Sequence, residues 1–140
     1  MLAATSATLC FSGTLLFLLA LLNGMAIPRL RSPRIGLSAH TTAIQSGTFL
    51  IVMGLLWPKL GLTPTWSAIL GHGLWISLYS LWLSLFLAGV FGAGRGMEIA
   101  GQGMTTSPLR QTIVTILGSA GSLVCLGAVV GVLIGGHWIF

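Results

Sequence analysis

Four long apolar stretches dominate this sequence of 140 residues and constrain its fold more than any other feature. A bilayer core is crossed by about 20 apolar residues in an α-helix. Each stretch is long enough to cross it, and none shows the two-residue alternation of a membrane strand. The sequence therefore predicts an all-α fold, an integral membrane four-helix bundle in which residues 1–140 form a single membrane domain. The helices are expected near residues 8–27, 37–57, 66–92 and 111–135.

Composition agrees with a membrane protein and argues against a soluble one. The chain is 55% hydrophobic and 5% charged, with a net charge of +5, whereas a soluble domain carries about 25% charged residues. The basic residues lie at the breaks between the apolar stretches, where they orient a membrane chain. We therefore expect the lipid bilayer, and no nucleic acid, as a partner. Cys10 and Cys125 lie inside apolar stretches and are expected to be packing residues.

The distribution of arginines predicts the orientation of the chain. The first and third breaks, 28–36 and 93–110, hold five arginines, whereas the second break holds only Lys59. By the positive-inside rule, a multi-pass protein of the cell inner membrane would keep loops 28–36 and 93–110 in the cytoplasm and both termini outside. The first stretch has no basic segment ahead of it, so we expect a retained helix rather than a signal peptide. Three tryptophans would then fall at the outer interface: Trp57, Trp66 and Trp138.

Rows of small residues in two of the stretches would let helices approach closely, and they predict a homo-oligomer. These rows are Gly127, Gly131 and Gly135 in the fourth stretch, and Gly73, Ser77, Ser80, Ser84 and Ala88 in the third. The third stretch also has an aromatic stripe at helical spacing, formed by Trp75, Tyr79, Trp82 and Phe86. The stripe is either a contact with lipid or another subunit, or one wall of a pocket for an aromatic substrate.

Two histidines stand out among the few polar groups inside the stretches, because such groups often mark function. His40 lies about one helical turn from the cytoplasmic side and His72 nearly two turns from the outer side. At about 1.5 Å per residue through a core of about 30 Å, they differ in depth by roughly 15 Å, so they cannot share one metal ion.

The remaining residues exclude several chemistries. There is no cluster of ligands for structural zinc. A Ser-His-Asp hydrolase and a proton-coupled exporter both lack an acid inside a span, because the single acid is Glu98. A site served by one neutral histidine remains, and haem iron can be held by a single axial histidine. Small residues on the His40 face, including Gly47, would leave room for a flat group or would serve close helix packing.

The sequence closely resembles the bacterial hydroxylaminobenzene mutases over nearly its whole length. The resemblance is carried by LLNGMAIPRLRSPRIGLSAHTTAIQSGTFLIVMGLLWPKLGL and by LGHGLWISLYSLWLSLF. More distantly, the central part is similar to the styrene oxide isomerases, also small four-helix membrane enzymes. The pattern shared with them is Ala39-His40, Ser46-Gly47, Pro58, Leu60-Gly61 and Leu70-Gly71.

The resemblance implies an activity, a cofactor and an assembly. The activity is the conversion of hydroxylaminobenzene (phenylhydroxylamine) to 2-aminophenol in nitroarene degradation. The cofactor is haem b, because the isomerases carry it on the histidine that matches His40. The resemblance also makes a trimer one candidate for the oligomer. Ser46 and Ser77 stand where the isomerases have an asparagine and an aspartate, as expected for a different substrate.

Together these considerations give a hypothesis for the site. Haem iron on His40 would act as a Lewis acid on the N–O bond of a small aromatic hydroxylamine. The candidate substrate-positioning residues are Gln45, Ser46, Ser77 and Tyr79. The candidate cofactor-binding residues are His40 as the metal ligand, Gly47, Arg34 and Arg110. The two arginines would pair with haem propionates, although their role as topology signals has the stronger support.

Three rival functions stay open at this point. The chain could be a non-catalytic membrane protein that binds haem or assists assembly. It could be a small exporter of aromatic cations, which the missing intramembrane acid disfavours. Closest to the main hypothesis is a cofactor-free mutase that uses Glu98 or a histidine as general acid.

Overall fold

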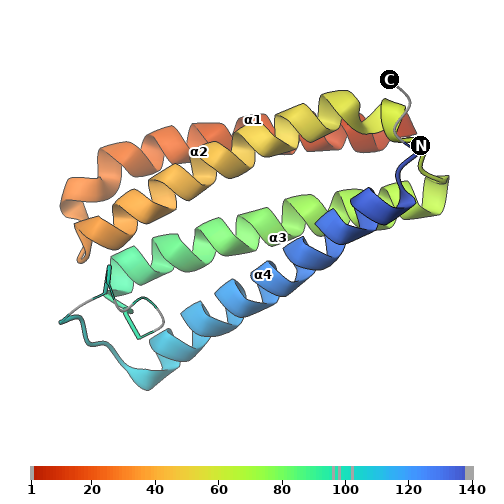
Figure 1. Ribbon diagram of the computed structural model, residues 1–140. Coiled ribbons are helices and arrows are strands. Elements are labelled where there is room, and N and C mark those ends of the chain that lie inside the picture. The colour runs from red at the N-terminus through yellow and green to blue at the C-terminus, as the bar shows by residue number, and fades with distance from the viewer. Residues whose placement is uncertain (1, 96, 98, 102, 138–140) are drawn as a thin grey trace.

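The computed structural model describes residues 2–95, 97, 99–101 and 103–137. Four long helices account for most of this chain and run alternately up and down, with two short 3₁₀ helices between them (Figure 1). Each long helix is long and apolar enough to cross a membrane, which confirms the predicted all-α membrane bundle. The elements are α1 (Leu2–Ala26), η1 (Ile27–Arg29), α2 (Pro33–Leu56), η2 (Trp57–Leu60), α3 (Pro64–Phe91) and α4 (Pro108–Gly135).

Prolines and glycines set the helix ends. Pro33, Pro64 and Pro108 stand in the first turns of α2, α3 and α4, where a fixed φ suits the helix and the missing N–H costs nothing. Gly92 ends α3 in the left-handed conformation, with a φ of 68°. The helices α1, α2 and α4 begin a few residues earlier than predicted. Apolar content underestimates helix length here, because the first turns hold small, hydroxyl and basic residues that a helix accepts.

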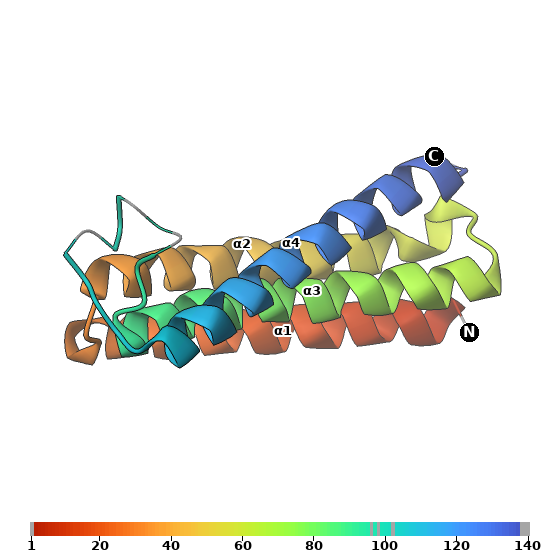
Figure 2. The same ribbon diagram turned by 90° about the horizontal axis from the view of Figure 1, so that it is seen from below.

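The helices are arranged as two hairpins, α1–α2 and α3–α4, and α3 is the helix that contacts all the others. The α1–α2 hairpin packs on α3, and α4 crosses α3 obliquely, so that α4 lies largely outside the three-helix unit (Figures 1 and 2). The connections α1–α2 and α3–α4 lie at one end of the bundle, and η2 lies at the other. The main core runs between the hairpins and includes Leu9, Leu16, Leu50, Trp57 and Leu74.

Trp57 is a core residue rather than an interfacial one, which corrects the prediction made for it. Its side chain is fully buried, and its Nε1 donates a hydrogen bond of 2.8 Å to Ser67 Oγ on α3. Trp66 at the same end is 55% exposed, as an interfacial tryptophan would be. Trp138 lies outside the described residues. Of the two tryptophans that lie near a proline at this end, Trp57 packs in the core and Trp66 is exposed.

Small residues bring the hairpin helices together, partly where the sequence predicted. Ser77 and Ser84 of α3 are buried, and Ser84 Oγ donates to Val114 O on α4 at 2.8 Å. On α4, close contacts are made by Gly118 and Gly121 and also, within the predicted row, by Gly131 and Gly135, where an added Cβ would lie 2.5 Å from Leu70 Cδ2 and 3.4 Å from Leu62 Cδ2; a Cβ added to Gly127 would meet nothing within 4 Å. The predicted glycine row of α4 is therefore wrong at Gly127, because the oblique crossing of α4 turns that position outward.

Candidate functional site

His40 lies in the seam between α1 and α2, and its ring is half-buried there. Its Nδ1 atom is 2.7 Å from the backbone oxygen of Ala20 on α1. A carbonyl oxygen only accepts hydrogen bonds, so Nδ1 must carry the proton. In the neutral ring the lone pair is then on Nε2, which has no hydrogen-bond partner among the described residues. A histidine that binds metal is typically arranged in this way, with its other ring nitrogen bonded to a backbone carbonyl.

This geometry fits haem ligation by one histidine better than a multidentate metal site. Within the described residues, no three His, Cys, Asp or Glu side chains gather closely enough to hold a metal ion. A haem iron needs only one imidazole with a free nitrogen and an open position opposite. His40 meets the first requirement, because its tautomer is set by Ala20 and its Nε2 is unpaired. His72 is exposed, and its Nδ1 bonds Ala68 O on its own helix at 2.7 Å.

Gly47 has a structural role in the single chain. A Cβ at this position would lie 2.8 Å from Gly13 O and 2.9 Å from Phe17 N, both backbone atoms of α1. Of the two roles that the sequence left open, the structure therefore shows close helix packing. The backbone of α1 occupies the space that was predicted for a flat cofactor beside Gly47.

Of the four candidate substrate-positioning residues, Tyr79 contacts α1 at a different depth from His40. Gln45 is exposed, and Ser46 is buried. Ser77 Oγ donates to Leu74 O of its own helix at 2.9 Å, and Tyr79 Oη donates to Ser12 O on α1 at 2.8 Å. Ser12 and Ala20 are eight residues apart on α1, so the Tyr79 contact and the His40 contact differ in depth by about 12 Å.

The aromatic stripe of α3 forms a continuous ladder of rings. The ring centroids are 6.0 Å apart for Trp75 and Tyr79, 6.4 Å for Tyr79 and Trp82, and 5.7 Å for Trp82 and Phe86. The first two pairs are edge-to-face and the last is stacked, as aromatic pairs prefer. The Nε1 atoms of Trp75 and Trp82 are buried without a hydrogen-bond partner among the described residues. The ladder is partly buried against the main core and retains these two unpaired donors.

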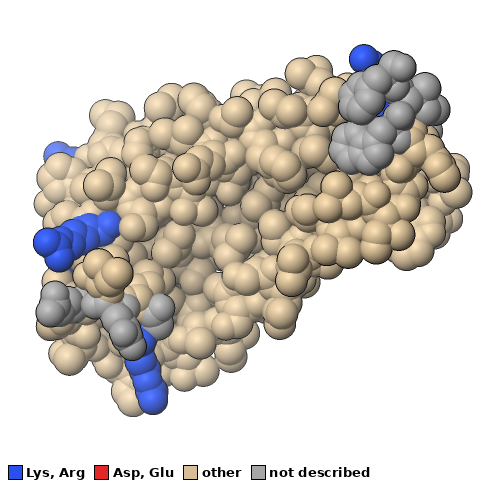
Figure 3. All heavy atoms as spheres, viewed as in Figure 1, with Lys and Arg blue, Asp and Glu red and all other residues tan. Residues whose placement is uncertain are grey.

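Arg34 and Arg110 lie at the same end of the bundle as His40 and are exposed. On the face shown in Figure 3, basic side chains lie toward the two ends and the middle is free of charge. The guanidinium of Arg110 is 5.0 Å from the centroid of the Phe91 ring. Arg31 instead ties the loops together, because its guanidinium donates to Phe91 O and Thr105 O at 3.2 Å. Arg34 and Arg110 are exposed and form no ion pair among the residues that the structure describes.

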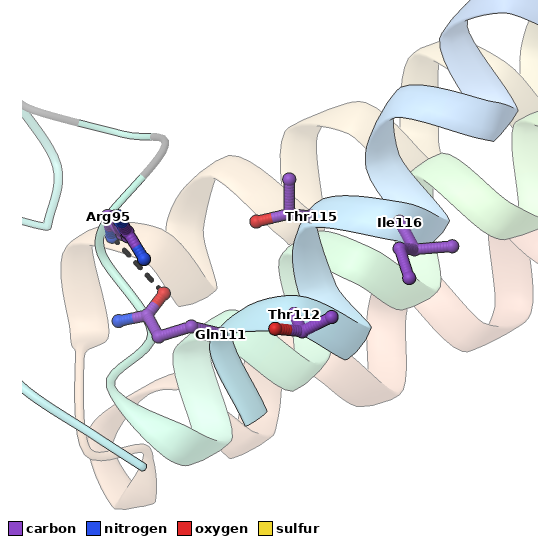
Figure 4. Close-up of a pocket in the computed structure, with 5 residues that line it drawn as sticks. All are labelled: Arg95, Gln111, Thr112, Thr115 and Ile116. Carbon is purple, nitrogen blue, oxygen red and sulfur yellow. Dashed lines mark hydrogen bonds between the residues drawn. The ribbon is translucent and has the colours of Figure 1, made fainter. Parts of the chain in front are cut away.

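A polar hollow at the start of α4 escaped the sequence analysis. It has a volume of about 310 Å³, and Figure 4 shows Arg95 above it and side chains of α4 along it. The backbone N–H of Arg95 donates to Gln111 Oε1 at 3.3 Å. The signal in the sequence was a row of hydroxyl residues at helical spacing in an apolar helix. The hollow is lined by Arg95, Gln111, Thr112, Thr115 and Ile116, so His40 is not part of it.

Comparison with known proteins assigns the chain to a family. The family model for styrene oxide isomerase matches residues 5–137, which is nearly the whole chain. This chain belongs to the styrene oxide isomerase family. Family members are isomerases, so the chain is a member of an enzyme family whose reactions rearrange a substrate.

Two relatives agree with the resemblance to hydroxylaminobenzene mutases. Hydroxylaminobenzene mutase HabB of Ectopseudomonas oleovorans is 40% identical over 104 residues, which cover 73% of this chain and 63% of HabB. Hydroxylaminobenzene mutase HabA of the same organism is 37% identical over 107 residues, which cover 76% of this chain and 79% of HabA. The match thus spans less than two thirds of the length of HabB. The predicted family relationship is confirmed.

Proposed function

We propose that this chain is a membrane-embedded mutase that converts hydroxylaminobenzene to 2-aminophenol, with haem b held by His40. The substrate is suggested by the names of two relatives that are 40% and 37% identical to the chain. The cofactor is supported by one observation above all: the Nδ1–H of His40 is bonded to Ala20 O, which leaves Nε2 as an unpaired donor of electrons.

The reaction is an isomerisation and needs no oxidant. The N–O bond breaks, a C–O bond forms at the ortho carbon, and the proton lost from that carbon is balanced by one gained on nitrogen. When bound, haem would supply an iron Lewis acid for the hydroxyl oxygen. The chain itself must hold the oxygen near the ring and exclude bulk water, because water would attack the para carbon as readily. A site within a membrane seam lined by apolar residues does exclude water.

The site would be completed by a second copy of the chain. Trp82 and Phe86 continue the ladder about 5 Å and about 10 Å beyond Tyr79 along α3. Because α1 and α3 run in the same direction (Figure 1), this continuation follows the direction from Ser12 to Ala20 and brings Phe86 close to the depth of His40. In one chain, however, this pair and His40 lie on different seams. A homo-oligomer, with a trimer as one candidate, could place the ladder of one copy against the half-buried His40 of another. Arg34 and Arg110 could then meet the propionates.

The proposed location follows from the charges at the two ends of the bundle. Loops 28–36 and 93–110 lie at one end and hold five arginines, whereas Lys59 is at the other end. We infer that these loops face the cytoplasm and that the protein resides in the cell inner membrane.

The first test is the visible spectrum of the detergent-purified protein, followed by anaerobic titration with hydroxylaminobenzene. We expect a haem band that shifts as substrate is added, and formation of 2-aminophenol. With ¹⁸O-labelled hydroxylamine oxygen, the label should be retained in the product if the transfer stays within the site. Formation of 2-aminophenol without a haem band would support the cofactor-free mutase instead. A haem band with no product would support a non-catalytic haem protein. If neither a haem band nor 2-aminophenol is found, the proposal is wrong.

A further inference from the structure

The last turns of α1 hold the ring of His40 through a hydrogen bond and a close approach of the backbone. Ala20 O accepts the hydrogen bond from Nδ1 of His40. One helical turn later, the backbone of Gly24 lies against the ring. Asn23 lies between these two residues in the sequence. None of the three was predicted as a site residue. We propose that Ala20, Asn23 and Gly24 form a positioning segment that sets the tautomer and direction of His40, with Gly24 as the decisive residue.

Gly24 is necessary because of where the imidazole lies. A Cβ added at Gly24 would be 2.9 Å from Cε1 and 3.0 Å from Nδ1 of His40. Contacts this short force a neighbour to move, and the ring would have to turn about its χ angles to escape. Because Nδ1 is itself one of the crowded atoms, we expect this movement to disturb its hydrogen bond to Ala20 O, which is 2.7 Å long. We therefore expect an alanine at position 24 to weaken the hydrogen bond between Nδ1 and Ala20 O, which fixes the tautomer.

Gly24 differs in this respect from the other glycines of the α1–α2 seam. A Cβ at Gly13 or Gly47 would meet backbone atoms of the opposite helix, so these two glycines serve the approach of the helices. The three nearest atoms to a Cβ at Gly24 all belong to the ring of His40. Its missing side chain thus makes room for one functional group, and not for the helix.

Asn23 supports the same turn of α2 from inside the bundle. Its side chain is 3% exposed, and its Nδ2 is 3.5 Å from Gly36 O. Gly36 is four residues before His40, so its carbonyl is also the helical partner of the His40 backbone N–H. The Oδ1 atom of Asn23 is buried and has no partner in the part of the chain that the structure describes, which costs stability. A polar group kept at this cost fits a role in setting the register of α2 against α1.

The link to catalysis rests on the proposed function, but the positioning itself can be tested without haem. The experiment is ¹⁵N NMR of histidine-labelled, haem-free full-length protein in lipid nanodiscs, with His40→Ala used to assign the signals. We expect His40 with Nδ1 protonated and Nε2 unprotonated. In Gly24→Ala, a substantial fraction should move to the tautomer with Nε2 protonated, which is favoured for histidine in the absence of such a bond. Gly127→Ala is the matched control, because its new Cβ meets nothing within 4 Å.

The haem-loaded protein gives a second readout. Gly24→Ala should bind haem about 10- to 100-fold more weakly, the range found when partners of metal-binding histidines are removed. If Gly24→Ala does not fold, Asn23→Leu tests the same segment, and we expect it to keep its thermal stability while the His40 signals broaden or shift. A wild-type His40 protonated on Nε2, or a Gly24→Ala spectrum equal to that of Gly127→Ala, would overturn the proposal. The expected tautomers in a chain that binds no haem would support the positioning segment and overturn the cofactor.

Discussion

The second helices of the two hairpins are both apolar enough to cross a membrane but are buried to very different degrees. In the most apolar window, 44% of the residues of the second span are buried, against 17% for α4. The α1–α2 seam is closed by backbone contacts at Gly13 and Gly47, and it carries His40. The α3–α4 pair touches along a narrower line and leaves most of α4 uncovered. A tight seam gives a fixed histidine, whereas an open helix leaves a surface for lipid or another copy.

The largest expected effect is a difference in activity between variants of His40, on the α1–α2 hairpin, and of His72, on the α3–α4 hairpin. His40→Ala should lower 2-aminophenol formation by at least about 100-fold, because the proposed iron ligand is removed. His72→Ala, which removes the exposed histidine of α3, should change it by less than about threefold. Initial rates in the same detergent, at equal protein concentration, measure both. Equal losses in the two variants would break the comparison and move the site away from the α1–α2 seam.

The next effect concerns the stability of the tight seam. Gly47→Ala places a methyl group 2.8 Å from Gly13 O, and because backbone cannot yield easily, we expect a loss of about 1–3 kcal/mol. Gly127→Ala on the open helix should be neutral or stabilising by about 0.5–1 kcal/mol, since alanine is the better helix former. Unfolding titrations in mixed micelles compare the two. A Gly47→Ala protein as stable as wild type would show that the seam can relax.

A smaller effect should be seen where α4 meets α3. Ser84 Oγ donates to Val114 O in a buried position, and Ser84→Ala removes this bond at a cost of about 1 kcal/mol. Ser122 Oγ donates to Gly118 O of its own helix at an exposed position, so Ser122→Ala should cost much less. Protease accessibility of the α3–α4 loop, together with unfolding, reads out this hairpin. If the two serine variants behave alike, α4 is held by contacts other than this bond.

The smallest effect is predicted for Tyr79, the candidate whose hydroxyl the structure shows to be engaged elsewhere. Tyr79→Phe loses the bond to Ser12 O and should cost about 0.5–1.5 kcal/mol of stability. Its turnover should stay within about threefold of wild type. Steady-state rates and thermal unfolding of the same preparation separate the two quantities. A fall in turnover beyond tenfold with stability unchanged would restore Tyr79 as a residue that acts on the substrate.

Much of the fold was predictable because a membrane leaves few choices for a polar backbone. Apolar length located the four helices, but three of them start at Pro33, Pro64 and Pro108, a few residues before the predicted starts near 37, 66 and 111. Trp57 and Gly127 were misplaced, since the side of a helix that faces inward depends on the crossing angle of its neighbour. Hydropathy contains little information about that angle, because all sides of these helices are apolar.

The candidate site was predictable in its centre but not in its surroundings. His40 stands out in the sequence as a rare ionisable group in a span. Its partners Ala20 and Gly24 carry no such signal, because one contributes a backbone oxygen and the other only the absence of a side chain. Asn23 is polar and lies in a span, but the sequence did not connect it with His40. Gln45, Ser46, Ser77 and Tyr79 were grouped by residue type; in the structure Gln45 is exposed, Ser46 and Ser77 are buried, and Tyr79 bonds Ser12 O about 12 Å in depth from the His40 contact.

The sequence by itself determined that this chain is a bundle of four membrane helices with one histidine suited to chemistry. Length and hydropathy suffice for the four helices, since each helix satisfies its own backbone in lipid. Only the tertiary structure decided which nitrogen of His40 is free, because the bond to Ala20 O comes from a different helix. It also decided that Gly47 closes a seam and that α4 stays open, because contacts between helices depend on rotation and crossing angle, which one helix alone does not specify.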